Sequence, residues 1–144
     1  METAAKPPLP IPDELTAFFW EGVRARKLMI LRCRSCGHFI HYPRPVCEKC
    51  RSEDLAPERV SGRATLYSFT ITMKPWHPYW IDKVPYVLAT VELSEQKGLK
   101  MLTNLVECPH DAIKVDMPVE VVFREVSEAL TLPFFRPAGV WRDA

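Results

Sequence analysis

The segment Cys33-Arg34-Ser35-Cys36 is followed, ten residues later, by Cys47-Glu48-Lys49-Cys50. Two Cys-x-x-Cys pairs at this separation can place four thiolates on one tetrahedral metal ion, because each pair forms a tight turn whose backbone N–H groups point at the sulfurs. The loop between the pairs is short and has no helical pattern, which favours a zinc ribbon made of two short hairpins. We therefore predict that Cys33, Cys36, Cys47 and Cys50 bind one structural zinc ion.

Two alternatives to a four-cysteine site follow from the same stretch. His38 and His41 lie in the loop and are possible ligands, but four well-spaced thiols make them bystanders. Two disulfides are the other alternative, which is weakened because residues 1–12 lack the basic-then-apolar form of a signal peptide. A catalytic zinc keeps one position open for water, whereas four thiolates close the site. The predicted metal therefore replaces a core that so small a lobe cannot build.

Length, composition and charge set limits on the remaining functions. The 144 residues, 47% of them hydrophobic, suffice for one domain-sized core and a metal-bound lobe. A formal charge of +1, from 19 basic and 18 acidic residues, argues against a polyanion-binding surface as the main function. No apolar run approaches membrane-spanning length. We expect a cytoplasmic protein, since paired cysteines in that compartment are more often metal ligands than disulfides.

A short amphipathic helix is predicted ahead of the ribbon, after a proline-rich arm. Asp13 is the expected N-cap, and Glu14 lies in the first turn, where the helix dipole favours a carboxylate. The apolar residues at helical spacing are Leu15, Phe18, Phe19 and Val23. With Trp20 they form an aromatic run that either packs on its own domain or contacts a partner.

Three cations crowd the end of this helix, namely Arg24, Arg26 and Lys27. The helix dipole favours cations there, so they are either an ordinary solvated helix end or a site for phosphates.

The rest of the chain predicts β-structure. Residues 28–32 form a short strand that leads into the first cysteine pair, and residues 51–57 lead out of the second. From Val60 onward the hydrophobic period becomes two, and we predict strands at residues 63–73, 85–93, 99–106, 119–126 and 129–135. Lys97-Gly98 marks a hairpin turn between the second and third of these strands. Five strands in this span favour a small closed barrel, with the oligonucleotide/oligosaccharide-binding (OB) fold as the leading candidate and a sandwich fragment as the alternative.

The predicted fold class is therefore mainly β, with an N-terminal helix, a zinc ribbon and a C-terminal five-stranded OB-fold barrel. The expected boundaries are an arm and helix at residues 1–27, the ribbon at 28–57 and the barrel at 58–144.

An aromatic loop, Pro75-Trp76-His77-Pro78-Tyr79-Trp80-Ile81-Asp82-Lys83, joins the first two barrel strands. An ordinary surface loop would contain Gly, Ser, Asn and Asp instead. Trp76, Tyr79 and Trp80 are therefore candidates for contact with a partner or a ligand, and packing on the barrel itself is the alternative. Stacking on nucleic-acid bases is a third alternative, which the near-zero charge argues against.

Cys108-Pro109-His110-Asp111 is the only other cluster of reactive side chains that the sequence suggests. Neighbours in sequence seldom form a working triad, because the base must approach the nucleophile and be oriented by a third group. A half-buried cysteine in a turn is the expectation. The sequence also lacks a Gly-rich phosphate loop and a nucleophile-elbow serine motif, so we predict no catalytic residues.

An ordered series of motifs, from about Leu15 to Pro137, resembles the DUF35 family, and this resemblance implies an N-terminal helical segment, a rubredoxin-like zinc ribbon and a C-terminal OB fold. The motifs are Phe18-Phe19-Trp20-Glu21-Gly22, Leu28, Cys33-x-x-Cys36-Gly37, Pro43-Arg44, Cys47-x-x-Cys50, Ser61-Gly62, Tyr67-Ser68-Phe69-Thr70, Pro85-Tyr86, Val91-Glu92-Leu93, Pro118-Val119-Glu120-Val121 and Pro133-Phe134-Phe135-Arg136-Pro137. The chain departs from the family pattern at Ala64 and Asp116, where glycines are usual, and this affects turn geometry and leaves the zinc pattern untouched.

The resemblance implies a function that composition does not reveal. Such proteins are usually non-catalytic partners of acyl-CoA enzymes, namely thiolases, thiolase-like aldolases, hydroxymethylglutaryl-CoA synthase and MaoC-like hydratases. We therefore expect a scaffold subunit in a hetero-oligomer with a thiolase-like or MaoC-like large subunit, aiding complex stability and CoA-thioester binding. The benzoylsuccinyl-CoA thiolase of anaerobic aromatic degradation is one possibility.

In that arrangement, two aromatic groups are expected to contact the partner and four cations to contact the CoA phosphates. The partner contacts are Phe18, Phe19 and Trp20 in the helix and Trp76, Tyr79 and Trp80 in the loop. The cations are Arg24, Arg26, Lys27 and Arg44, since guanidinium groups suit phosphate geometry. A single-stranded nucleic-acid binder and a free-standing acyl-CoA-binding protein remain alternative functions.

Overall fold

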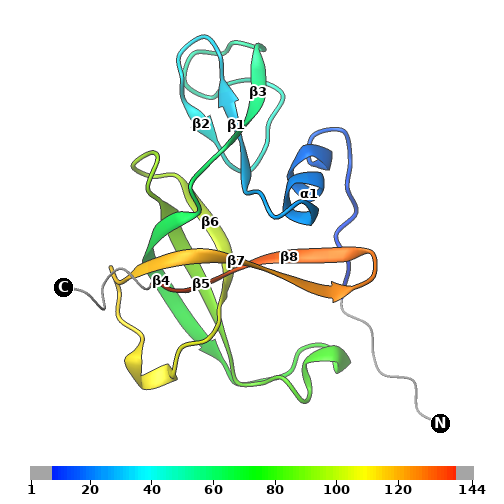
Figure 1. Cartoon of the computed structure of the whole chain (residues 1–144), viewed down its shortest axis with the longest axis vertical. Coiled ribbons are helices and arrows are strands. Elements are labelled where there is room, and N and C mark those ends of the chain that lie inside the picture. The colour runs from blue at the N-terminus through cyan, green and yellow to red at the C-terminus, as the bar shows by residue number, and fades with distance from the viewer. Residues whose placement is uncertain (1–7, 139–144) are drawn as a thin grey trace.

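The computed structural model describes residues 8–138, which form a small three-stranded sheet, a short helix and a closed barrel (Figure 1). The small sheet comprises β1 (Met29–Cys33), β2 (Phe39–Ile40) and β3 (Leu55–Arg59), in the order β2-β1-β3. β1 pairs antiparallel with both neighbours. The predicted strand before the first cysteine pair is confirmed, with a shift of one residue. β3 was not predicted, because the chain after the second pair lacks strand periodicity.

Helix α1 (Ala17–Arg24) lies between the small sheet and the barrel (Figure 1). It begins later than predicted, with Thr16 as the N-cap residue. Asp13 instead caps the turn that precedes the helix, and its Oδ1 accepts hydrogen bonds from the backbone N–H groups of Leu15 and Thr16, both at 2.9 Å. The helix packs closely on the chain that follows it, since a Cβ at Gly22 would lie 2.5 Å from Cγ of Met29. The predicted helix is thus confirmed, and the assignment of its N-cap to Asp13 is wrong.

The barrel has five strands in the order β4-β5-β6-β8-β7, and pairing between β4 and β7 closes it. The strands are β4 (Arg63–Thr72), β5 (Tyr86–Leu93), β6 (Lys100–Leu105), β7 (Pro118–Ser127) and β8 (Leu130–Pro137). All pairs are antiparallel except β6 with β8. The five predicted strands and the closed barrel are confirmed. Gly98, at φ 83°, forms part of the predicted turn between β5 and β6.

Two short 3₁₀ turns interrupt the barrel connections, η1 (Pro78–Trp80) in the aromatic loop and η2 (His110–Ala112) between β6 and β7. Among residues 8–138, no helix is long and apolar enough to cross a membrane.

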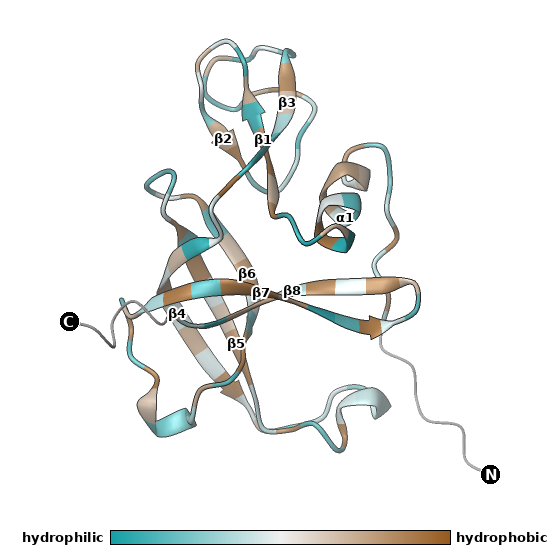
Figure 2. Cartoon of the chain, in the orientation of Figure 1, coloured by the Kyte–Doolittle hydropathy of each residue, from teal (hydrophilic) through white to brown (hydrophobic). Residues whose placement is uncertain are grey.

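The main core fills the barrel and extends to the helix and the small sheet. Alternate residues of β5 are buried along its length, as expected for a strand with one face inward. Figure 2 shows the corresponding alternation of apolar and polar residues along the barrel strands. Phe135 and Leu66 are fully buried, and Phe19, Ile30 and Phe39 belong to the same cluster. The helix and the ribbon are therefore packed against the barrel by a shared core.

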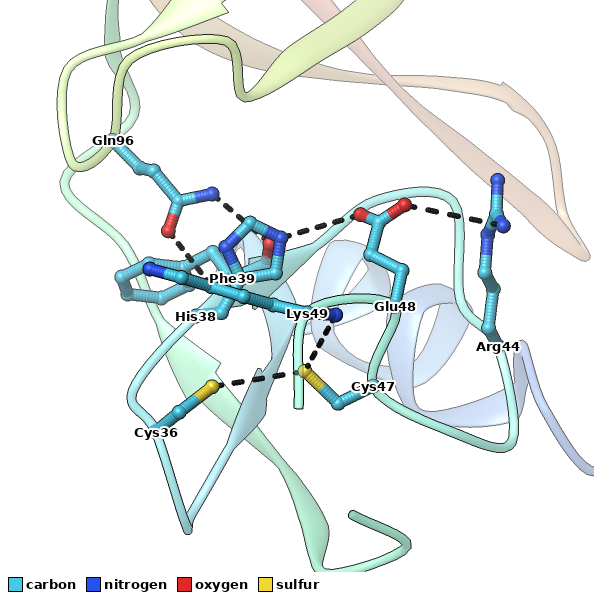
Figure 3. A network of polar contacts seen from close by, with 8 residues as sticks. All are labelled: Cys36, His38, Phe39, Arg44, Cys47, Glu48, Lys49 and Gln96. Carbon is cyan, nitrogen blue, oxygen red and sulfur yellow. Dashed lines mark hydrogen bonds and ion pairs between the residues drawn. The ribbon is translucent and has the colours of Figure 1, made fainter. Parts of the chain in front are cut away.

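Gln96, in the turn between β5 and β6, ties the ribbon to the barrel by polar contacts (Figure 3). Its Oε1 accepts a hydrogen bond from Phe39 N–H at 2.9 Å, and its Nε2 donates to the Phe39 carbonyl at 3.1 Å. Nearby, the Leu102 N–H donates to Oη of Tyr42 at 3.1 Å. The two lobes therefore share both apolar and polar contacts.

Candidate metal centre and neighbouring surfaces

The four predicted cysteines converge on one point at the tip of the ribbon. The Sγ atoms of Cys33, Cys36, Cys47 and Cys50 all lie within 4.8 Å of one another. The Cys33–Cys50 and Cys36–Cys47 sulfur distances are 3.5 and 3.7 Å. Tetrahedral zinc with Zn–S bonds of about 2.3 Å requires sulfurs about 3.8 Å apart. The donor set and its spacing therefore fit a four-thiolate metal site.

Two equivalent turns hold these sulfurs. Gly37 N–H donates to the Cys33 carbonyl at 2.9 Å, and Arg51 N–H donates to the Cys47 carbonyl at 2.8 Å. Both turns need a left-handed residue after the second cysteine, which is Gly37 at φ 80° in one and Arg51 at φ 66° in the other. The two halves of the site are thus built alike, and only the first uses glycine.

Backbone N–H groups favour the thiolate form of the two buried cysteines. The Cys36 N–H approaches Sγ of Cys33 at 3.5 Å, and this contact is the main cause that lowers the Cys33 pKa to about 6. For Cys47, burial raises the pKa, but the N–H groups of Cys50 and Lys49 and the thiols of Cys36 and Cys50 together lower it more, so the net shift is downward. The Lys49 N–H lies 3.4 Å from Sγ of Cys47 (Figure 3). At Cys50 the Ser52 N–H lowers the pKa, but the neighbouring sulfurs, Cys33 first, outweigh it and raise the pKa to about 12. The backbone therefore favours thiolates at Cys33 and Cys47, and a bound cation would displace the proton of Cys50.

The two loop histidines lie outside the sulfur cluster. Nε2 of His38 is 3.2 Å from Oε1 of Glu48, whose other oxygen lies 3.9 Å from Arg44 (Figure 3). The His41 ring packs against Phe19 and Tyr42, with centroids 5.7 and 4.1 Å away. Neither histidine belongs to the four-sulfur group, in agreement with the prediction that they are bystanders.

The four predicted phosphate-binding cations lie in two parts of the chain. Arg24, Arg26 and Lys27 are exposed at the end of α1, whereas Arg44 is exposed in the ribbon loop. Arg26 donates to the Phe123 carbonyl and lies 3.5 Å from Glu125, so it ties the helix end to β7. Within residues 8–138, neither Arg24 nor Lys27 forms an ion pair.

The predicted partner-contact aromatics differ in exposure. Phe19 is only 7% exposed and belongs to the core, so little of its side chain faces solvent, and its contact with a partner stays a prediction. Phe18 and Trp20 are half-buried at the edge of that core. An amphipathic helix buries one face against the core, and Phe19 and Val23 lie on the buried face of α1.

The aromatic loop combines packed and projecting rings. Trp80 lies against Tyr86 of β5 and edge-on to Tyr79, with centroids 4.8 Å apart in both pairs. Trp76 is 76% exposed, and Nζ of Lys74 lies 4.5 Å from the centroid of its ring. The loop is therefore anchored by Trp80 and presents Trp76 to solvent.

Cys108 shows no sign of activation. It is half-buried, and burial together with the nearby Asp111 carboxylate raises its pKa. Its thiol contacts the Pro109 carbonyl at 3.5 Å. A thiol with a raised pKa is a poor nucleophile at neutral pH, as expected for a cysteine in a turn.

Comparison with known proteins agrees with this architecture. The family model for the ChsH2 rubredoxin-like zinc ribbon domain matches residues 20–56, and the model for the ChsH2 C-terminal OB-fold domain matches residues 57–124. A chain of the solved structure "Ltp2-ChsH2(DUF35) aldolase" is 37% identical, with a TM-score of 0.81 over 90% of this chain and 98% of that chain.

Two curated relatives differ in length. A "Probable enoyl-CoA hydratase alpha subunit" from Thermomonospora curvata is 38% identical over 95% of this chain, but this chain spans only 43% of that relative. A "DUF35 domain-containing scaffold protein" from Methanocaldococcus jannaschii is 30% identical over 81% of this chain and 82% of the relative. The resemblance inferred from the motifs is thus confirmed over most of both chains, and the protein belongs to the DUF35 family.

Proposed function

We propose that this chain is a non-catalytic accessory subunit of an acyl-CoA-processing enzyme. The similarity to a chain of an aldolase structure, along nearly the whole of that chain, carries the proposal. The chemistry of the described residues supports it, because the four thiolates leave no open metal position and Cys108 is not activated. We also propose that the bound metal is zinc and that its role is structural.

A thiolase-like large subunit is the partner we favour, and a MaoC-like hydratase is the second choice. Hydratase subunits occur among the relatives, including a "3-oxo-4,17-pregnadiene-20-carboxyl-CoA hydratase alpha subunit" from Mycobacterium tuberculosis. This chain spans only 40% of that protein, so most of its length has no counterpart in the match. The specific system we propose is a thiolase of aromatic-compound degradation, such as a benzoylsuccinyl-CoA thiolase. The cytoplasmic location stays a prediction.

The aromatic loop is the partner surface we propose first. Trp76 is accompanied by two other exposed apolar side chains, Met73 at 70% and Ile81 at 65% exposure. Large exposed apolar side chains that cluster in one loop are typical of protein-binding sites, and tryptophan is the residue type most enriched among energetic hot spots. Trp80 and Tyr79 hold the loop in shape, so the partner would meet a preformed surface.

The partner proposal is tested by affinity purification of the tagged chain from its native extract at moderate salt, with metal content measured on the same sample. We expect a thiolase-like or hydratase-like protein in fixed ratio and about one zinc per chain. Trp76→Asp should reduce partner recovery at least tenfold, whereas Val115→Asp, a control at a similarly exposed apolar residue, should leave it unchanged. A zinc-loaded chain that is recovered alone, or with nucleic acid, would contradict the accessory role.

For the CoA phosphates, Arg24 and Lys27 are the stronger candidates, because Arg26 and Arg44 already have acidic neighbours. In the purified complex, the double variant Arg24→Glu/Lys27→Glu should raise the Michaelis constant for the CoA thioester several-fold. Lys114→Glu, an exposed lysine in the connection between β6 and β7, serves as the control. An unchanged Michaelis constant in the double variant would show that Arg24 and Lys27 do not bind the CoA phosphates. Arg44→Glu would then test whether the ribbon loop binds them.

A further inference from the structure

The outer part of the β7–β8 hairpin, which extends beneath α1 (Figure 1), has backbone groups that no third strand covers. β4 pairs with β7 only at residues 118–120, and beyond them the Val121 N–H donates to the Gly62 carbonyl at 2.9 Å, on the side away from β8. Alternate residues of a strand present their backbone groups to the same side. Those of Phe123 and Glu125 therefore also point away from β8, and we call them the free β7 edge.

A side chain from outside the barrel covers part of the free β7 edge. Nη1 of Arg26 donates to the Phe123 carbonyl, and Nη2 of Arg26 lies 3.5 Å from Oε1 of Glu125. The β8 edge of the same hairpin is protected in another way. Pro133 has no N–H to offer, and its carbonyl accepts a hydrogen bond from Oγ1 of Thr103 at 3.1 Å. The free β7 edge contains no proline, and the Arg26 guanidinium takes that role there.

Arg26 adopts a backbone conformation that glycine would adopt more easily. It follows α1 in a Schellman motif, in which the Arg26 N–H donates to the Val23 carbonyl at 3.0 Å and the Lys27 N–H donates to the Gly22 carbonyl at 2.8 Å. The φ angle of Arg26 is 64°, in the left-handed region that favours glycine. Glycine would suit the helix end better, so the benefit of arginine lies in its side chain, which reaches β7.

We propose that Arg26 blocks the free β7 edge, and that the strand it excludes is β7 of a second copy of this chain. Two antiparallel β7 strands related by a two-fold axis complement each other, because Phe123 of one copy can exchange N–H and carbonyl hydrogen bonds with Glu125 of the other. Arg26 already occupies the Phe123 carbonyl, which leaves the Glu125 N–H of the other copy without its acceptor. Arg124 would lie at the axis, where Glu107 of the same copy pairs with it at 2.7 Å.

The experiment is sedimentation velocity of the full-length, zinc-loaded chain over a range of concentrations, with amide hydrogen exchange to locate the contact. Arg26→Gly should lower the dissociation constant of the dimer about five- to a hundredfold, because each copy regains one hydrogen bond. The amides of Phe123 and Glu125 should become protected in that dimer. Glycine is compatible with the helix end, so the variant should remain folded. Lys27→Gly, at the next residue, is the matched control and should leave the dissociation constant unchanged.

A second substitution tests whether the free β7 edge is the surface that pairs. Glu125→Pro in the Arg26→Gly chain removes an N–H that points away from β8, and it should return self-association to the wild-type level. Glu125→Ala keeps the N–H and should not. Unchanged self-association in Arg26→Gly would overturn the blocking role. Tight dimers that survive Glu125→Pro, or that leave the Phe123 and Glu125 amides unprotected, would overturn the site. Because the isolated chain is used, these failures are distinct from failure of the accessory-subunit proposal.

Discussion

The ribbon and the barrel are both built from β-strands, but different interactions hold them together. The ribbon has a buried cluster of its own that consists of Leu31, Cys33, Ile40 and Cys47, and two of these four residues belong to the four-cysteine group that is positioned to bind a metal ion. The barrel encloses a much larger cluster with fully buried Leu66, Val91 and Phe135. A lobe with so few apolar side chains cannot offset its conformational entropy by burial, and the proposed metal ion would supply the missing stabilisation.

The two lobes are nevertheless not independent. Ile30 and Phe39 belong to the ribbon strands but are buried in the cluster of the barrel. The boundary between the two buried clusters therefore lies within β1. The Ile30 side chain belongs to the barrel cluster, and the Leu31 side chain belongs to the ribbon cluster. Successive side chains of a strand point to opposite faces, and here the two faces are stabilised by different means.

Metal removal should produce the largest effect and should separate the lobes. Chelation, or Cys47→Ser, is expected to unfold the metal lobe, because structural zinc sites contribute about 10–16 kcal/mol of apparent binding free energy. Amide hydrogen exchange should then show loss of protection at Leu31 and Ile40 and retained protection at Val91. Cys108→Ser, outside the sulfur cluster, is the control. Simultaneous loss of both lobes would show that the barrel also depends on the metal.

The complementary change is Phe135→Ala in the barrel. Phe135 is 0% exposed, and removal of a buried phenyl ring costs about 3–5 kcal/mol of unfolding free energy. Urea unfolding of the zinc-loaded chain, monitored by circular dichroism, measures the loss. Phe134→Ala, at the neighbouring half-buried position, should cost clearly less. Equal losses from both variants would contradict the assignment of Phe135 to the centre of the core.

His41 should make the junction between the lobes sensitive to acid. Its pKa is about 4 in the folded chain against an ordinary 6.5, so the unfolded chain binds the proton more readily. Stability is therefore fully present above pH 6.5 and falls as the pH drops toward 4. At pH 5 the loss is 6.5 − 5 = 1.5 pH units, or about 2 kcal/mol.

Urea unfolding between pH 5 and 8 tests this dependence, with metal content monitored at each pH. His41→Phe should remove this part of the slope, and His38→Phe is the matched control at the other histidine of the ribbon loop. The same slope in wild type and His41→Phe would show that other groups cause the acid sensitivity.

Gln96→Ala should give the smallest of these effects and should loosen the joint between the lobes. It removes the partners of the Phe39 N–H and carbonyl, at a cost of about 1 kcal/mol for partly buried groups. Residual dipolar couplings of the two lobes measure their relative orientation. Gln96→Glu, which keeps the acceptor and loses the donor, should fall between wild type and Gln96→Ala. Unchanged couplings in Gln96→Ala would show that apolar packing alone fixes the orientation.

Local patterns in the sequence were sufficient to predict the four-cysteine ribbon and the barrel strands. The four-cysteine group was predicted from the short spacings within each pair. The five barrel strands were predicted from a hydrophobic period of two, which arises because one face of each strand is buried. Gly98 was recognisable as a turn residue because its left-handed conformation favours glycine.

Features that depend on contacts distant in sequence were not predictable. β3 contains Pro57, Glu58 and Arg59 and has little strand character, and it forms because β1 provides a pairing partner. The Gln96–Phe39 contact spans 57 positions, and no local signal marks it. The burial of Phe19 and His41 likewise depends on how the helix and the ribbon loop pack on each other.

The short pairings that close the barrel have a consequence for how this molecule can be recognised. Each of the five barrel strands has a neighbour on both sides, but β4 pairs with β7 only at residues 63–65 and 118–120, and β6 pairs with β8 only at Leu105 and Phe135. The outer part of the β7–β8 hairpin therefore keeps an open edge on each strand. The open edges of the small sheet are β2, only two residues long, and β3, which carries a proline and two charged residues. Such edges resist main-chain pairing. Strand addition is therefore expected only at the outer β7–β8 hairpin, and elsewhere in the described part of the chain recognition depends on side-chain shape and chemistry.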